Sequence, residues 1–504
     1  MITLYGKHYV SKILGYSNIL IKHALFIILV KYFGFLIALI AFIIISKIYV
    51  FLVCLIFDLE DLQRMDQFFI KNNSKKNYTL GGIMHFKSND KDKLVKTIQE
   101  RLFLRFPKTL GSIYMFLGKY YFTTPRIKKL NFDEQLKLIK KRTIIIENIE
   151  KSKLEEFIQK ELNTSVNIFE DIFKIFIIKY KNTASINSNI NNINDDNDSI
   201  DISNDYNISI FIKTDHSFCD GLAFVSLIGH LDDNFDINKY PSIMKRSITW
   251  KQHILILIPD LIKILTFGIF EFIYYNNFNK KYYKGFNNKY SYNTVITSPL
   301  TYSLDKVKQT SKDLNISINT LCLNAIFIAF KNLSPSSEKI SFMMPVGTKG
   351  IAKSVQDVEL NNSANAAIAT IDLNKVYKIF KDREFDKANK LLNIQVKSYI
   401  IKIITFITTY YKYFLNAVLL SDSIEFDYEL CVSNIPGQTT KVKIANDELV
   451  NMYPVISIRF QKAFIAIMSY REIINFSIIR DDDESIDGNE IKSELKRCLD
   501  TICL

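Results

Sequence analysis

The sequence predicts an α/β protein made of two lobes of similar size that follow an apolar N-terminal segment. Strand patterns and amphipathic helix patterns mix in both halves of the chain, which favours sheets packed against helices. The 504 residues are enough for two or three domains, and the 48% share of hydrophobic residues supports buried cores. An uncharged run between Lys31 and Lys47 sets the N-terminal segment apart from both lobes.

Residues 1–57 are expected to form a membrane anchor. The run 24–57 is interrupted by only two lysines, and about 20 apolar residues are enough to cross a bilayer as a helix. The run is apolar on all faces and too long for a cleaved signal peptide. Basic residues lie on both flanks, so the positive-inside rule does not orient it. A single transmembrane helix and a hairpin bent between Gly34 and Ser46 both remain open, and a buried core helix is the alternative.

The net charge of +13 suits three classes of partner: a nucleic acid, an anionic lipid surface and an anionic cofactor such as coenzyme A. Nucleic acid is the weakest of these, because no basic helix, zinc-ligand spacing or aromatic RNA-binding motif accompanies the charge. The six cysteines are scattered, with no CxxC pair. This pattern argues against a disulfide framework and a zinc site, and favours a reducing compartment.

The first lobe is predicted to span 58–245. Apolar positions at helical spacing alternate there with apolar strand patterns. The predicted helices are 59–70, 91–106 and 153–164, and the predicted strands are 78–88, 173–180 and 208–214. A polar insert near 182–206 joins the last two strands. It is too polar to bury itself, so we expect a disordered loop and not a domain boundary.

An apolar crossover, 246–292, is predicted to lead into a second lobe at 293–504. The crossover and a similar stretch from Tyr399 suit a membrane-apposed helix, the lining of an apolar channel or a plain core helix. The second lobe begins with a strand and two helices, the second of them capped by Ser317 or Asn319. Its further strand patterns are 340–346, 367–373, 428–437, 456–460, 464–470 and 474–480.

His216 is the one histidine of six that follows a strand in a polar loop, where catalytic groups tend to lie. Apolar alternation along 208–214 places one face of that strand on a core. His216 continues this alternation, so its side chain is expected on the interior side. Asp220 and Gly221 then open an apolar helix, with Asp as a strong N-cap and Gly permitting the turn. A turn histidine beside a structural cap is the alternative that the local residues leave open.

Residues Asp215–Gly221, DHSFCDG, resemble the HHxxxDG motif of acyl-CoA-dependent acyltransferases with the chloramphenicol acetyltransferase-like fold. Five other segments resemble the wax ester synthase/diacylglycerol acyltransferase family. RMDQFF around Asp66 is similar to its S-P-x-D-x-x-F element, and ISINTLCLNAIFIAF to its T-V-N-D-V-x-L-A-A helix. MMPVGTK is similar to P-V-x-x-R, and CVSNIPG, Cys431–Gly437, to S-N-V-P-G-P. SYREIINFSIIRDDDES resembles the closing segment, so the matches run in family order from about Leu59 onward.

The sequence departs from the family pattern at four of these positions. Asp215 stands where the motif has its first His, and Thr320 where the helix usually has Asp. Gln438 replaces the last Pro, and Lys349 replaces Arg, which keeps the charge but loses the planar fork. These changes concern rate and acceptor choice more than fold.

The resemblance implies two chloramphenicol acetyltransferase-like lobes with an active-site tunnel between them and His216 as general base. Asp220 is implied to hold the loop, and a carboxylate at Asp215 is expected to raise the pKa of the neighbouring imidazole. The other implied motif residues, structural or near the tunnel, are Gly221, Asn319, Ser433, Asn434 and Gly437. A Cys219–His216 nucleophile pair is a minor alternative. No metal and no permanently bound cofactor are implied, since acyl-CoA is a substrate.

The function implied is acyl transfer from acyl-CoA to a long-chain alcohol, giving a wax ester, or to diacylglycerol, giving triacylglycerol. The expected partners are these substrates and a lipid bilayer, and the expected location is the endoplasmic reticulum membrane with the lobes facing the cytosol. An inactive, membrane-anchored lipid-binding protein of the same fold is the alternative, favoured by Asp215 and Thr320. A condensation-type enzyme acting on carrier-protein thioesters is disfavoured, because no carrier domain or linker is visible.

Overall fold

The computed structural model describes residues 4–62, 64–70, 78–117, 119–181, 206–240, 282–287, 289–347, 349–384, 387, 428–459 and 461–503. The predicted insert near 182–206 and the apolar stretch from Tyr399 lie outside the described residues, as does most of the predicted crossover.

The first six-stranded sheet carries the His216 loop at the end of one of its central strands. The strand order is β12 (Lys443–Ile444), β13 (Asp447–Ile456), β2 (Thr79–Lys87), β7 (Ile208–Asp215), β6 (Phe173–Tyr180) and β5 (Thr143–Ile149). α4 (Lys91–Gln99) and α8 (Gly221–Gly229) contribute to the core on one face. α7 (Leu154–Asn163) packs on the other face. β7 is therefore buried on both faces, so the alternation along it does not select an interior side.

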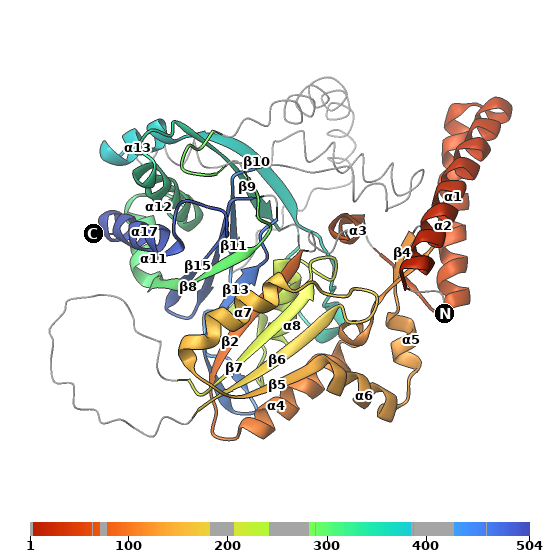
Figure 1. Cartoon of the computed structure of the whole chain (residues 1–504), viewed down its shortest axis with the longest axis horizontal. Coiled ribbons are helices and arrows are strands. Elements are labelled where there is room, and N and C mark those ends of the chain that lie inside the picture. The colour runs from red at the N-terminus through yellow and green to blue at the C-terminus, as the bar shows by residue number, and fades with distance from the viewer. Residues whose placement is uncertain are drawn as a thin grey trace.

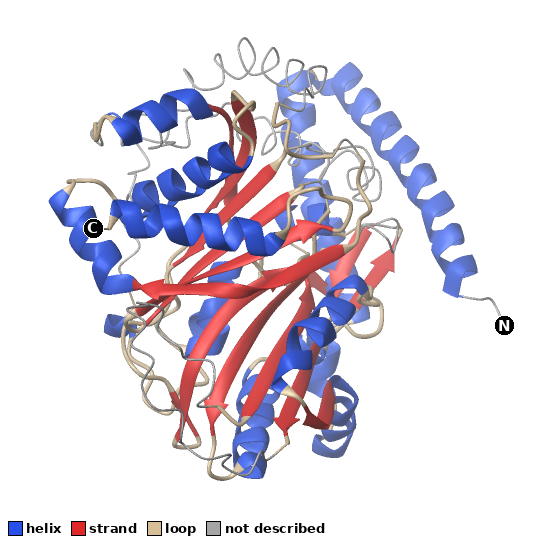
Figure 2. Ribbon diagram, turned by 60° about the vertical axis from the view of Figure 1, so that its left-hand side comes forward, coloured by secondary structure: helices blue, strands red, loops and turns tan. Residues whose placement is uncertain are grey.

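The second six-stranded sheet has all of its main helices gathered in one core. Its order is β10 (Asn365–Asp372), β9 (Lys339–Val346), β11 (Leu430–Ile435), β14 (Ala463–Tyr470), β15 (Ile473–Asp481) and β8 (Thr294–Ser303). The helices are α11 (Leu304–Asp313), α12 (Ile318–Leu333), α13 (Leu373–Lys381) and α17 (Gly488–Ile502). Ser317 is the N-cap of α12, accepting a hydrogen bond from the Thr320 N–H. Figure 2 shows the two sheets with helices on their outer faces.

The two lobes are interlocked and not contiguous in sequence. β12 and β13 come from the predicted second lobe, 293–504, yet β13 pairs antiparallel with β2 of the first sheet. The predicted division into two consecutive lobes is wrong at this point. The sequence pattern assigned a strand to 456–460 and missed β13, which contains Pro454. Proline cannot donate a ladder hydrogen bond and so weakens a strand assignment, yet here Pro454 lies opposite Gly82.

The N-terminal segment is a helical hairpin that stands beside the two lobes (Figure 1). α1 (Leu4–Phe33) and α2 (Phe35–Phe57) meet at Gly34, whose φ of 75° suits a residue without a side chain. Phe26 and Phe42 pack edge to face across the hairpin, with ring centroids 5.6 Å apart. The bend lies within the predicted stretch, and its relation to a membrane stays a prediction. Within the residues described, no single helix meets the length and hydropathy expected of a membrane span.

The base of the hairpin rests on a small three-stranded sheet and the helices that follow it. That sheet has the order β1 (Glu60–Asp61), β4 (Lys119–Phe122) and β3 (Ile113–Phe116), and Val53 of α2 packs there against Tyr121. The remaining helices are α3 (Arg64–Phe69), α5 (Thr124–Lys129) and α6 (Phe132–Arg142). α3 places Asp66 and Phe69 next to the His216 loop.

Candidate active site

His216 is fixed by a backbone hydrogen bond and by two aromatic neighbours. Its N–H donates to the Tyr78 carbonyl at 2.7 Å, which ties the loop to the start of β2. The imidazole stacks on the Phe69 ring, with centroids 3.9 Å apart and planes 14° from parallel. Tyr78 meets the imidazole edge-on at 6.2 Å. The orientation of the ring is therefore set by α3 and β2, two elements far from it in sequence.

The pKa of His216 is lowered, mainly because burial disfavours the charged imidazolium. Its own backbone carbonyl, the charge of Asp220 and the Asn362 side chain partly offset this effect. An imidazole with a lowered pKa is neutral at physiological pH. Neutral imidazole is the form that can accept a proton from a hydroxyl group.

Asp215 closes the turn and does not face the base. Its Oδ1 accepts hydrogen bonds from the Ser217 N–H at 2.9 Å and the Ser217 Oγ at 2.6 Å. Burial raises the pKa of Asp215 itself to about 6. The expectation that Asp215 would raise the pKa of His216 is therefore wrong, because burial dominates that imidazole and lowers its pKa.

Asp220 joins the motif to the second lobe through both carboxylate oxygens. Oδ1 caps α8 by accepting from the Ala223 N–H at 2.9 Å. Oδ2 accepts from the backbone N–H groups of Ser363 at 2.8 Å and Ala364 at 3.0 Å. This aspartate therefore fixes the start of α8 against the loop that precedes β10.

Asn362 completes the junction, and the sequence analysis did not single it out. Its Nδ2 donates to the His216 carbonyl at 2.7 Å and to Asp66 Oδ1 at 2.9 Å. Its backbone N–H reaches the same Asp66 oxygen at 2.6 Å. Asn362 thus links α3 to the backbone of the base. The only sequence signal was the polar triplet Asn361–Ser363 directly before a strand.

Three other motif residues, Asn319, Ser433 and Asn434, make contacts within the second lobe. Asn434 Nδ2 donates to Asn319 Oδ1 at 3.3 Å, and Asn319 Nδ2 lies 3.6 Å from Met344 Sδ. Ser433 lies in β11 opposite Ala466. Among the described residues, the structure records no hydrogen bond from Asn319 or Asn434 to His216.

Two glycines of the predicted motifs lie at tight contacts. A Cβ on Gly221 would lie 2.6 Å from Ile435 Cδ1, so the start of α8 packs directly against β11. A Cβ on Gly437 would overlap the Ser469 carbonyl oxygen, and the Gly437 N–H donates to Ser469 Oγ at 3.2 Å. Gly437 therefore permits a close approach to the backbone of β14, whereas the contact at Gly221 is with a side chain.

Cys219 is not suited to act as a nucleophile. Its side chain is fully buried, and burial raises the pKa of the thiol well above its usual value. The reactive form of cysteine is the thiolate, which this site disfavours.

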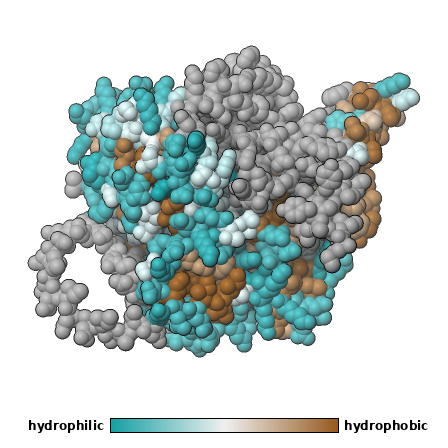
Figure 3. All heavy atoms as spheres, in the orientation of Figure 1, coloured by the Kyte–Doolittle hydropathy of each residue, from teal (hydrophilic) through white to brown (hydrophobic). Residues whose placement is uncertain are grey.

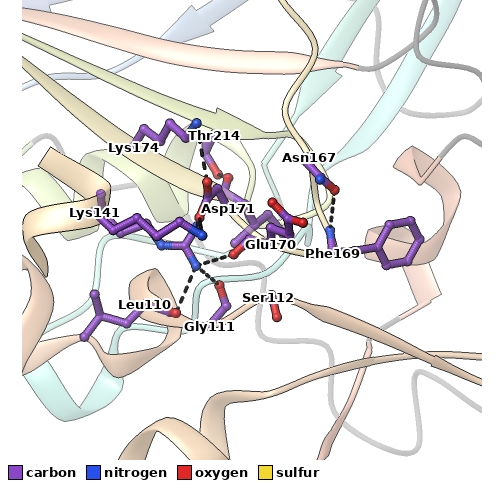
Figure 4. Close-up of polar contacts among 12 residues, drawn as sticks. Leu110, Gly111, Ser112, Lys141, Asn167, Phe169, Glu170, Asp171, Lys174 and Thr214 are labelled. Carbon is purple, nitrogen blue, oxygen red and sulfur yellow. Dashed lines mark hydrogen bonds and ion pairs between the residues drawn. The ribbon is translucent and has the colours of Figure 1, made fainter. Parts of the chain in front are cut away.

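A network of polar contacts around Asp171 lies beside Thr214 at the end of β7 (Figure 4). Arg142 pairs with Asp171 at 2.7 Å and donates to the carbonyls of Leu110, Gly111 and Glu170. Thr214, two residues before His216, donates its hydroxyl to the Ile172 carbonyl at 2.9 Å. The strand that carries the base is therefore fixed to a rigid network.

Two of the cavities that flank the loop 349–363 are lined by residues of the predicted motifs. One, of about 350 Å³, is lined by Asp66, Lys108 and Asn361 among others. The second, of about 320 Å³, is lined by Lys349, Ser226 and Ser363 among others. His216 lines neither of them. The tunnel implied by the resemblance stays a prediction.

Comparison with known proteins gives one domain match and several structural matches. Residues 389–502 match the WS/DGAT C-terminal domain. The structure resembles the wax ester synthase/diacylglycerol acyltransferase from Marinobacter aquaeolei VT8, with a TM-score of 0.53, 12% identity and coverage of 88% of this chain and 98% of that one. The C-terminal match supports the resemblance of this chain to the wax ester synthase/diacylglycerol acyltransferase family, and the structural match shows a shared fold. The matched domain includes the CVSNIPG segment and leaves out the His216 motif.

Other solved structures share the fold of this chain. Trichothecene 15-O-acetyltransferase from Fusarium sporotrichioides matches with a TM-score of 0.52 and 12% identity over 87% of this chain and 93% of that one. A starter condensation domain of rhizomide synthetase in complex with C8-CoA and Leu-SNAC matches with a TM-score of 0.51 and 5% identity. That match covers 90% of this chain and 95% of the other. A comparison with curated proteins gave no match. At these identities the solved structures show a common α/β fold, and the family supports acyl transfer in general.

Proposed function

We propose that this protein is a membrane-anchored O-acyltransferase that moves a fatty acyl group from acyl-CoA to a long-chain alcohol or to diacylglycerol. The observation that carries the proposal is the His216 imidazole, whose neutral form is favoured by burial and whose orientation is set by Phe69. The match of residues 389–502 to the WS/DGAT C-terminal domain supports acyl transfer, and the apolar hairpin suits acceptors dissolved in a bilayer.

The reaction follows from one base and two substrates. His216 takes the proton of the acceptor hydroxyl while the oxygen attacks the thioester carbon. The tetrahedral intermediate collapses by breaking the carbon–sulfur bond, and the imidazolium returns its proton to the departing coenzyme A thiolate. Products are the ester and free coenzyme A, so atoms and charges balance without a further reactant.

The supporting groups act on the base and not on the substrates. Asn362 and the Tyr78 carbonyl fix the backbone of His216, and Asp220 fixes the helix that follows. Because proton transfer depends steeply on geometry, holding the imidazole in place is their contribution to rate.

The test uses purified full-length protein with an acyl-CoA and either hexadecanol or diacylglycerol. Thin-layer chromatography identifies the ester, and free coenzyme A is measured by thiol release. We expect ester from the wild type and at least a 100-fold loss in His216→Ala and His216→Gln, since general base catalysis contributes about 10²–10⁴-fold. A folded wild type without activity, or variants with unchanged activity, would favour the inactive lipid-binding protein instead.

The proposed location is the endoplasmic reticulum membrane with both lobes in the cytosol, where acyl-CoA is available. Protease treatment of sealed microsomes tests it. A C-terminus that is digested without detergent agrees with this orientation, and a protected C-terminus contradicts it.

A further inference from the structure

The outer face of α2 carries an apolar stripe whose side chains are largely exposed among the described residues. Its side chains are 44–68% exposed and recur at helical spacing through 44–56: Ile44, Ile45, Ile48, Phe51, Leu52, Leu55 and Ile56. The opposite face is covered, because Val53 packs against Tyr121 and Phe42 packs against Phe26. The exposure therefore belongs to one face of a packed helix and not to a loose one.

The first arm of the hairpin repeats this pattern. Its exposed apolar residues are Leu20, Ile21, Ile27, Ile28 and Tyr32, each 51–72% exposed. Figure 3 shows hydrophobic residues gathered on the projecting hairpin. Contiguous exposed apolar surface of this kind marks a site of interaction, because leaving it in water is unfavourable.

Charge selects the partner. Residues 4–57 contain five lysines and no aspartate or glutamate. Lys47 borders the α2 stripe directly before Ile48, and Lys31 precedes Tyr32 near the tip. At the base of the hairpin, Arg126 donates to the Phe57 carbonyl at 2.9 Å, and Lys128 of the same helix is exposed. Asp58 and Glu60 follow at the base, where Asp58 pairs with Lys129 at 2.6 Å. An apolar hairpin that itself carries lysines and no carboxylate matches the acyl chains and anionic headgroups of a bilayer.

A second copy of this chain matches the same surface less well. In a two-fold pair the same patch meets itself, so the lysines of one hairpin would approach those of the other without any carboxylate on the hairpin to neutralise them. The observations therefore favour lipid over self-association.

We propose that the α1–α2 hairpin inserts into an anionic bilayer through these two stripes and enters and leaves on the same side, because Gly34 turns the chain back. The insertion deepens the proposed function by naming the lipid chemistry that holds the enzyme beside its acceptor. It does not depend on catalysis, since binding is set by the hairpin alone.

Flotation of the full-length protein with vesicles tests the proposal. Protein in mild detergent is mixed with phosphatidylcholine vesicles, with or without phosphatidylserine, and the detergent is removed. We expect the wild type to float with the vesicles, with a preference for phosphatidylserine. The triple variant Ile48→Ser, Phe51→Ser, Leu55→Ser should lose at least tenfold in partitioning. Lys31→Gln with Lys47→Gln should lose the phosphatidylserine preference by threefold or more.

The matched control is Phe132→Ser, Leu136→Ser, Ile145→Ser, which removes exposed apolar side chains on α6 and β5 and should float like the wild type. Equal flotation of wild type and hairpin variant overturns the proposal. A change from dimer to monomer in the hairpin variant, without a change in flotation, assigns the surface to a second copy.

Acyl transfer to a short alcohol in detergent separates the insertion proposal from the proposed catalytic function. A hairpin variant that is active but does not float supports both membrane insertion and the proposed acyl transfer. An inactive wild type that floats contradicts only the proposed acyl transfer.

Discussion

Asn362 binds Asp66 and the backbone of His216 with the same side-chain nitrogen. Nδ2 lies 2.9 Å from Asp66 Oδ1 and 2.7 Å from the His216 carbonyl oxygen. These residues come from α3, from the loop after β7 and from the loop before β10. The position of the base therefore depends on three segments meeting at one amide.

Removing that amide should slow the reaction more than it unfolds the protein. In Asn362→Ala the buried Asp66 carboxylate loses its side-chain donor, and a lost hydrogen bond of this kind costs about 1–3 kcal/mol. We expect kcat to fall tenfold or more, with KM changed less, and the acid limb of the pH–rate profile to shift because Asn362 contributes to the pKa of His216. Steady-state kinetics between pH 5 and 8 measures both. Ser363→Ala is the control, since the Ser363 backbone N–H still reaches Asp220, and a kcat loss as large there would contradict the assignment.

Asp215 gives a stability prediction with a defined pH window. Burial raises its pKa from 3.8 to about 6, so the native state disfavours the charged form. The protonated form of Asp215 is favoured in the native state, and its full contribution to stability is present below pH 3.8. That contribution is lost as the pH rises through 6. Asp215→Asn keeps the acceptor for Ser217 and removes that loss, so its stability relative to wild type should increase from pH 4 to pH 7.5, by about 3 kcal/mol at most. Urea unfolding at both pH values measures it, and a constant difference would contradict the prediction.

The two motif glycines should differ in their tolerance of a methyl group. A Cβ at Gly437 overlaps backbone, the Ser469 carbonyl, which cannot move without breaking β14. A Cβ at Gly221 meets only Ile435 Cδ1, the end of a flexible side chain. Gly437→Ala should therefore destabilise the protein by about 2 kcal/mol or more, and Gly221→Ala should destabilise it by less. Adding Ile435→Val to Gly221→Ala should restore the lost stability. Thermal unfolding measures both, and equal losses would show that the contact at Gly221 is not relieved by side-chain movement.

Local patterns predicted the elements whose residues are neighbours in sequence. The strand before His216, the Asp220 cap and the Ser317 cap are all readable from consecutive residues, because a strand end and a helix start have their own residue preferences. The bend of the N-terminal hairpin was readable for the same reason, since Gly34 interrupts an otherwise uniform run.

Contacts between distant segments could not be predicted in this way. β13 pairs with β2 across more than 360 residues, and Asn362 reaches His216 from 146 residues away, so neither leaves a periodic signal. The parity argument for His216 failed for a related reason. β7 is buried on both faces by helices from different parts of the chain, and alternation cannot report a side when both sides are covered.

Arg142 should be the most sensitive residue beneath the site. It is 2% exposed, and its guanidinium bridges Asp171 to three backbone carbonyls. In Arg142→Met the buried Asp171 carboxylate keeps only Lys141 at 3.3 Å and Lys174 at 3.5 Å as cationic partners. Breaking a buried pair by removing one partner costs about 3–5 kcal/mol, so we expect a loss in that range by urea unfolding. Lys153→Met, which removes an exposed cation paired with Glu156, should cost less than about 1 kcal/mol. If Asp171→Asn added to Arg142→Met restored stability, the loss would come from the stranded charge; if it did not, the three carbonyl contacts would be the larger contribution.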